Sequence, residues 1–222
     1  MTRKTIYFLI LLIPIVFNGC LNYYQETTLK TDGSGKMFIH YWMKTTTAKD
    51  SAFVQQVGVF NQDSVKAEFF SKHSTINRVE VFSDSTDTTV HAQIELAFQS
   101  IDSLNNTRAF RESAFALKNG ATGQKIFSQF IPPVATGFGV NPELFTVTYV
   151  YYIPGDIITS NAASQSKNKL TWTYKLSEIG AGKTITVTFR PFRLKETPVW
   201  IYFLAGMVLL VVIVFLFRKN KS

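Results

Sequence analysis

The sequence predicts an α+β domain in which a mostly antiparallel sheet of about eight strands packs on one main helix. Segments with period-two alternation, such as Val90 to Phe98 and Phe145 to Ile153, recur along the chain between turns rich in Gly or Asp. One longer segment, residues 48–71, instead places apolar residues at helical spacing. A pure β-sandwich is the alternative if that segment is not helical.

The first half of the domain contains two predicted hairpins and the predicted helix. Tyr24 to Lys30 and Lys36 to Met43 flank an Asp-Gly turn, which favours a hairpin. Apolar residues at Phe53, Val57 and Phe60 indicate the helix, which Gly58 and the segment 61–63 divide into two shorter ones. A second hairpin joins 78–83 to 88–99.

The second half is predicted to be strands joined by short turns. Residues 112–118 pair with 124–131 after a short turn or helix at 100–110, and an irregular segment follows at 132–139. The strand 145–153 comes next, and strands 170–176 and 185–189 close the domain around Gly180-Ala181-Gly182.

The N-terminus has the order of a secretory signal. Arg3 and Lys4 precede an apolar stretch, Ile6 to Phe17, that is shorter than the roughly 20 residues needed to span a bilayer. Phe17-Asn18-Gly19-Cys20 then resembles a lipobox, in which a small residue precedes a cysteine that is acylated after cleavage. We expect residues 1–19 to be a lipoprotein signal peptide and Cys20 to be lipidated. The alternative is that Cys20 is an ordinary residue of an uncleaved anchor.

The C-terminal segment predicts a transmembrane helix over residues 198–217. Val199 to Phe217 carries no charge and, as a helix, would be about 28 Å long, close to the thickness of a hydrocarbon core. The basic tail, residues 218–222, agrees with a cytoplasmic location. Residues 20–197 would then form an extracytoplasmic domain, held to a bacterial cell membrane by an acyl anchor and by one helix.

The chain has a formal net charge of +8. Without the five basic residues of its two terminal segments, the middle part has a charge of only about +3, too weak to indicate nucleic-acid binding. With one cysteine, which the lipobox would consume, the domain has no disulfide and depends on its core for stability.

No motif indicates catalysis or metal binding. The three histidines, His40, His73 and His91, are not at metal-ligand spacing, and no Gly-x-Ser-x-Gly pattern is present. Gly182-Lys183-Thr184 lacks the strand-to-helix context of a phosphate-binding loop and is interpreted as a turn. We therefore expect no enzyme, no catalytic residues, no metal and no cofactor; a His, Asp and Ser cluster formed by folding would revive the enzyme hypothesis.

Aromatic residues on several predicted strands are the candidate ligand-binding residues. Packing in the core is one explanation, and a pocket for a lipid or another apolar ligand is the other, because Tyr and Trp combine an apolar body with a polar tip. The candidates are Phe38, Trp42, Tyr149, Tyr151, Trp172 and Tyr174, with His40 on the same strand face as Phe38 and Trp42.

The overall layout resembles the LppM-like family of bacterial membrane-anchored lipoproteins, which combine a lipobox, an extracytoplasmic α/β domain and a C-terminal transmembrane helix. The segments that carry the resemblance are Cys20, residues 30–35, Ile153 to Ile157, Ser160-Asn161-Ala162 and Leu170-Thr171-Trp172. The resemblance implies a non-enzymatic domain that binds lipid or another hydrophobic envelope component. The alternative hypothesis is an interaction or assembly subunit of a membrane complex; the protein partner is unknown.

Overall fold

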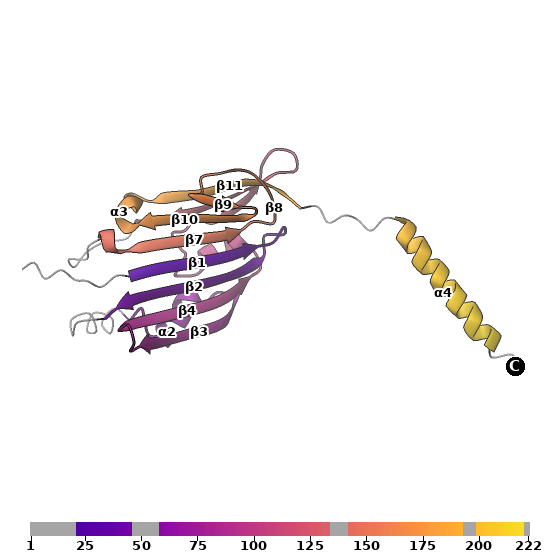
Figure 1. Cartoon of the computed structure of the whole chain (residues 1–222), viewed down its shortest axis with the longest axis horizontal. Helices are drawn as coiled ribbons and strands as arrows, with labels where there is room; N and C mark the ends of the chain where they lie inside the picture. The colour runs from indigo at the N-terminus through magenta and orange to yellow at the C-terminus, as the bar shows by residue number, and fades with distance from the viewer. Residues whose placement is uncertain (1–20, 46–57, 134–141, 193–198, 220–222) are drawn as a thin grey trace, which may run out of the picture. The chain divides into compact units, whose positions relative to one another are not determined.

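The computed structural model describes residues 21–45, 58–133, 142–192 and 199–219 and divides them into a domain that ends at Pro191 and a separate C-terminal unit. The domain is built from two sheets (Figure 1). The larger sheet has seven strands in the order β3 (Ser74–Asp84), β4 (Thr89–Phe98), β2 (Gly35–Lys44), β1 (Leu21–Leu29), β7 (Thr146–Tyr152), β10 (Lys169–Lys175) and β9 (Ser164–Ser166). The smaller has four, in the order β5 (Ala116–Asn119), β6 (Lys125–Ile131), β11 (Lys183–Pro191) and β8 (Gly155–Ser160).

The hairpins predicted from the sequence are confirmed. β1 pairs with β2 across a turn in which Gly33 has a φ of 89°, a conformation that glycine adopts without a steric penalty. β3 pairs with β4 and β5 pairs with β6, each in antiparallel register. These pairings are local in sequence, so turn residues and alternation are enough to predict them.

The centre of the large sheet is formed by a pairing that is not local. β1 lies between β2 and β7, and it runs parallel to β7, with Asn22 opposite Thr146 and Thr28 opposite Tyr152. The other pairings in both sheets are antiparallel. The prediction of a mostly antiparallel architecture is therefore confirmed, with this one parallel pair as the exception.

The two sheets share one hydrophobic core. The ring of Phe127 on β6 packs 4.7 Å from that of Tyr151 on β7, measured between ring centroids. The Tyr151 hydroxyl donates a 2.6 Å hydrogen bond to Gln129 Oε1 on β6 and accepts one of 2.9 Å from Gln25 Nε2 on β1. A buried polar contact thus joins the two sheets where each is covered by the other.

Asn161, which follows β8, forms a second link between the sheets. Its Oδ1 accepts hydrogen bonds from Trp172 Nε1 on β10, at 3.0 Å, and from the backbone N–H of Thr186 on β11, at 2.9 Å. Its Nδ2 donates to the carbonyl of Thr184, also on β11. One side chain therefore satisfies the indole of a fully buried tryptophan and holds it against the smaller sheet.

The helical part of the prediction is only partly confirmed. Helix α2 (Gln62–Phe69) begins after Asn61, whose side chain accepts hydrogen bonds from the backbone N–H groups of Asp63 and Ser64. Val65 and Phe69 are buried, and Phe69 packs edge-to-face on Phe110. The segment with Phe53 and Val57 lies outside the described residues.

The remaining short helices are η1 (Ile101–Asn106), η2 (Pro142–Leu144) and α3 (Leu176–Ile179). The prediction of a single sheet packed on one main helix is wrong. The large sheet packs mainly on a second sheet, and α2 has only eight residues. The predicted strands 170–176 and 185–189 are present as β10 and β11, but these two strands belong to different sheets. Strands β8 and β9 were not predicted.

The C-terminal unit contains helix α4 (Val199–Lys219), in the segment for which the sequence predicts a membrane span. Its large apolar side chains are exposed wherever they are described, from Trp200 to Ile213 and at Phe215. Among the described parts of the chain, no helix combines the length and the apolar character needed to cross a membrane. The predicted signal peptide, Cys20, part of the segment at 132–139 and the end of the tail lie outside the described residues.

Replacement of Tyr151 by Phe tests the contact between the sheets. The change leaves Gln25 and Gln129 buried without this partner, so we expect the free energy of unfolding to fall by about 1–3 kcal/mol. Urea denaturation of the wild type and variant measures the difference. The matched control is Tyr152→Phe, on the opposite face of β7, for which we expect a change within about 0.5 kcal/mol. Equal stability of Tyr151→Phe and wild type would contradict this role.

Candidate functional site

The two faces of the seven-stranded sheet have different environments. Figure 1 looks along the shortest axis of the chain and shows the seven strands side by side. One face packs on the core, where Ile39, Ile94 and Trp172 are fully buried. The opposite face, which we call the open face, carries the alternate residues of each strand, and most of these are half-buried or exposed.

Six rings form a continuous row across the open face, which we call the aromatic row. On β1 and β2, Tyr24 packs on Phe38 with ring centroids 6.5 Å apart, and Phe38 lies 6.3 Å from His40. His40 stacks on Trp42 at 4.6 Å and on His91 of β4 at 5.2 Å. Phe82 of β3 completes the row by stacking on His91 at 4.8 Å.

Alternation on four neighbouring strands explains why these rings meet. Met37, Ile39 and Met43 are buried in the core, so Phe38, His40 and Trp42 must point the other way. The cross-strand pairs Trp42–His91 and Phe82–His91 are directly opposite in register. The row is therefore a property of the backbone pairing, with each ring supported by a ring on the next strand.

Two histidines lie in contact within the row. His40 Nε2 is 3.0 Å from His91 Nδ1, and His91 Nε2 is 2.6 Å from the hydroxyl of Thr89. The Thr89 hydroxyl in turn donates to Asp87 Oδ1. In the consistent arrangement, His91 donates to Thr89 through Nε2 and accepts from His40 at Nδ1. Each nitrogen of His91 then has one partner, and a carboxylate lies at the end of the chain of hydrogen bonds.

Burial in the row and the proximity of His91 both lower the pKa of His40 below its usual value, burial being the larger cause. Burial also raises the pKa of Tyr24, and the hydrogen bond of 2.5 Å from its hydroxyl to Glu26 acts in the same direction. Both groups therefore stay neutral at physiological pH, and the row has an apolar character there.

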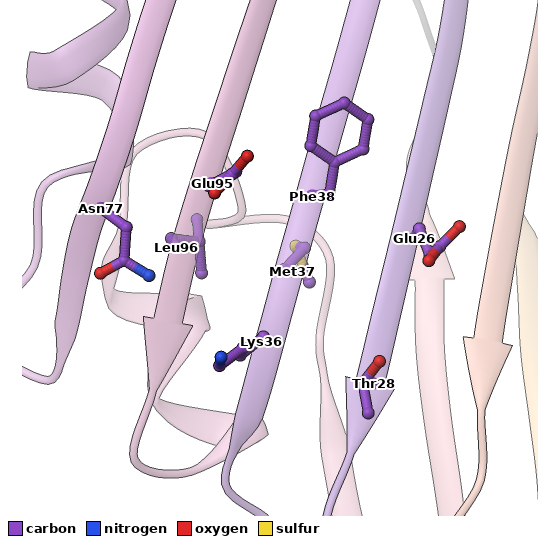
Figure 2. A pocket seen from close by; sticks show the side chains of 8 residues that line it. All are labelled: Glu26, Thr28, Lys36, Met37, Phe38, Asn77, Glu95 and Leu96. Atoms are coloured by element: carbon purple, nitrogen blue, oxygen red, sulfur yellow. The ribbon is translucent and has the colours of Figure 1, made fainter.

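A shallow depression of about 270 Å³ adjoins the row at the end of the strands near the β1–β2 turn (Figure 2). Its open-face lining includes Phe38, Lys36, Glu26 and Glu95. Asn77 reaches the depression because a β-bulge in β3 interrupts the register between Ile76 and Arg78. The depression has both charged and apolar walls and is open to solvent.

Lysines lie at both ends of the strands around the aromatic row. Lys36 and Lys44 lie at the two ends of β2, and Lys169 and Lys175 lie at the two ends of β10. Lys169 Nζ lies 5.7 Å from the centroid of the Tyr152 ring, and Lys175 Nζ donates to the Thr146 hydroxyl. The open face thus combines the aromatic row on β1, β2, β4 and β3 with lysines at strand ends and with the carboxylates of Glu26 and Glu95.

The structure places the six predicted ligand-binding residues on opposite faces of the sheet. Phe38 and Trp42 belong to the aromatic row on the open face. The other four point into the core, where Tyr151 and Trp172 are fully buried and hydrogen-bonded, Tyr149 is buried and Tyr174 half-buried. A single pocket lined by all six is therefore not formed.

The sequence predicts His40 beside Phe38 and Trp42, but not the ring partners on the neighbouring strands, Tyr24, His91 and Phe82. The alternation of β4 does place His91 on the outer side, and the β3–β4 hairpin brings Phe82 beside it, so that half of the row was predictable. The pairing of β2 with β4 has no local signal, because the helix α2 and strand β3 separate them in sequence. The contact between His40 and His91 could not be predicted for that reason.

Within the described residues, no three His, Cys, Asp or Glu side chains are close enough together to hold a metal ion. The polar groups of the open face are suited to hydrogen bonding and the rings to apolar contact. The arrangement defines a class of site: a flat, ring-lined surface with a basic margin, on a two-sheet α+β domain.

Comparison with known proteins gives one finding at the level of the fold. No protein-family model matches the chain, and no curated protein matches it. Among solved structures, the NMR structure of the folded domain of Mycobacterium tuberculosis LppM is similar, with a TM-score of 0.48 and 16% sequence identity. The match covers 86% of this chain and 97% of that one.

The histidine pair predicts a loss of stability in acid. Because the pKa of His40 is lowered by folding, the unfolded chain takes up this proton first as the pH falls, and stability is lost as the pH falls below about 6.5. Urea midpoints at pH 7.5 and pH 5 should differ less for His40→Gln than for the wild type. His73→Gln, at an exposed position outside the row, should retain the wild-type difference. Identical pH dependence in all three proteins would contradict the prediction.

Proposed function

We propose that this chain is a membrane-anchored envelope lipoprotein whose domain binds lipid or another hydrophobic envelope component, without catalysis, through the aromatic row. The observation that carries the proposal is the row itself. An antiparallel sheet with one covered face normally presents polar residues to water on the other, whereas here six rings gather on the open side. A continuous exposed surface of this kind is typical of an interaction site.

The energetics of the row suit a lipid ligand. Complete burial of one Trp or Phe side chain contributes about 1.5–3 kcal/mol, so partial burial of several rings is enough for measurable binding. Tyr24, Trp42 and the histidines also carry polar atoms that can remain in contact with head groups or water. The lysines at the strand ends add attraction for anionic groups.

The core-facing aromatic residues support a surface site rather than an internal one. Tyr151 and Trp172 are in contact with the second sheet and have hydrogen-bond partners there. Phe127, Ile185 and Val187 of the smaller sheet are fully buried in the same core. A ligand that replaced these contacts would have to separate the sheets, which the open face does not require.

Attachment to the membrane is the second part of the proposal. The lipobox-like tetrapeptide ending at Cys20 supports acylation, and Cys20 directly precedes β1. The exposed apolar side chains of α4 support its insertion into a bilayer, because such a surface is costly to keep in water. The domain would then be extracytoplasmic and the basic tail cytoplasmic.

Acylation is tested by metabolic labelling with an alkyne fatty acid. Wild-type protein should be labelled and Cys20→Ala should not, because the chain has no other cysteine to carry the thioether-linked lipid. A Cys20→Ser variant serves as a second, nearly isosteric control. Labelling that persists in both variants would contradict a lipoprotein.

Lipid binding is tested with residues 21–192, which contain the compact domain. Sedimentation with vesicles of phosphatidylcholine and phosphatidylglycerol should show binding that weakens roughly tenfold for Trp42→Ala, through the loss of apolar contact. Thr184→Ala, on the outer side of β11, is the matched control and should bind like the wild type. Native mass spectrometry of the same domain identifies any lipid that copurifies. Absence of binding by the wild type would contradict the proposal.

A second candidate function is an interaction or assembly subunit of a membrane complex. The observation in its favour is the pair of small residues Ala205-Gly206 within α4, which would allow another helix to approach closely. Crosslinking in membranes that recovers one partner in fixed stoichiometry, together with no lipid binding by the domain, would favour this function.

A further inference from the structure

The chain enters and leaves the domain at opposite ends of the strands. Leu21 starts β1 at the end where it is level with Met43 of β2. Pro191, the last residue of β11, pairs with Gly155. Gly155 comes three residues after Tyr152, and Tyr152 pairs with Thr28 near the far end of β1. Pro191 therefore lies toward the end of β1 that is far from Leu21. The nine residues of β1 give a separation of about 26 Å along the strand direction.

These positions restrict how a domain attached at both ends can stand on a membrane. No residue separates Cys20 from β1, so an acylated Cys20 holds the start of β1 at the bilayer surface. The eight Cα–Cα steps from Pro191 to Val199 span at most about 29 Å when the chain is fully extended. A domain standing on its Leu21 end would leave this connection almost completely taut, at a high entropic cost, whereas a domain lying on its side leaves it slack.

The sides of the domain differ in the chemistry they would present to the bilayer. The outer surface of the smaller sheet carries Thr184, Thr186 and Thr188 along β11, with the exposed aliphatic side chains of Ile126 and Ile158 on its other strands and no row of rings. The open face of the larger sheet carries the aromatic row, and β1, the strand that follows Cys20, belongs to this sheet. Rings with polar tips favour the head-group level of a bilayer, and threonine does not share this preference.

The lysines of the open face complement an anionic membrane, and the carboxylates of Glu26, Glu80 and Glu95 lie on the same face. Lys36 and Lys44 end β2, and Lys175 ends β10, all three with exposed side chains. Arg78 is engaged by Glu80 at 2.6 Å and lies 3.8 Å from Glu95, which removes part of the negative charge of this face. Basic residues near the surface of an anionic leaflet are attracted to its head groups.

We infer that the domain lies with its strands along the membrane and its open face against the bilayer, so that the occupant of the aromatic row is the lipid head-group layer of the anchoring membrane itself. This inference rests on the proposed function, since it requires the attachment at Cys20 and at α4. In this arrangement the aromatic row binds lipids that remain in the membrane and does not extract a single lipid from it.

The first measurement locates Trp42. Full-length acylated protein with Trp200→Phe retains Trp42 on the open face and Trp172, which is fully buried. In vesicles of phosphatidylcholine and phosphatidylglycerol, nitroxide lipids labelled at the head group should quench Trp42 fluorescence. The same protein with Trp42→Phe added reports Trp172 alone and should show no such quenching.

The second measurement separates a domain on its side from an upright one. Spin labels are placed at Thr28→Cys, on the open face far from Leu21, and at Thr184→Cys, on the outer side of β11; both threonines are exposed. The label at position 28 should collide several-fold less often with a water-soluble nickel complex than the label at position 184. Equal exposure of both labels with quenching of Trp42 would show an upright domain and overturn the inference.

The outcomes also separate this inference from the proposed function. Fatty-acid labelling at Cys20 together with unquenched Trp42 would leave a lipoprotein whose open face is turned away from the membrane. Loss of labelling and of membrane association would instead contradict the proposed function. Reaction of Cys20 itself with the spin label reveals an unacylated thiol and serves as the internal check.

Discussion

The hydroxyl of Tyr151 is the contact on which the arrangement of the two sheets depends. It accepts from Gln25 on β1 and donates to Gln129 on β6, so three strands from two sheets meet at one oxygen atom. Burial raises the pKa of Tyr151, which keeps the hydroxyl protonated and able to donate. Because unpaired amides at this depth are costly, only one alignment of the sheets satisfies all three side chains.

The alignment of the two sheets also determines which face of the seven-stranded sheet stays exposed to solvent. The four-stranded sheet is narrower than the seven-stranded one, and α2 and Phe110 complete the cover of the core beside β3. Since alternate residues of a strand point to opposite faces, fixing Tyr151 inward on β7 and Gln25 inward on β1 fixes Tyr24 and its neighbours outward. The aromatic row therefore follows from the core, and no separate element is required to build it.

The sequence predicts the elements well and their assembly less well. Period-two alternation from Val90 to Phe98 gave the correct faces of β4, and the Asp-Gly turn gave the β1–β2 hairpin. β10 and β11 have the same alternation, and nothing in their sequences indicates that β10 belongs to the larger sheet and β11 to the smaller one. The same limit applies to the site: Phe38 and Trp42 were identified, but their separation from Tyr149 and Trp172 depends on pairings between distant strands.

The position of β1 has a consequence for how the chain reaches its folded state. β1 leaves the ribosome first, yet it lies in the middle of the large sheet, and its partner β7 is distant: Gln25 and Tyr151 are 126 positions apart. Until β7 is available, one edge of β1 has unpaired N–H and C=O groups. Closing such a long loop is slow, so the chain stays unfolded while most of it is being made. For the export that we propose, this delay is an advantage, because a secretion channel accepts an extended chain and excludes a finished sheet.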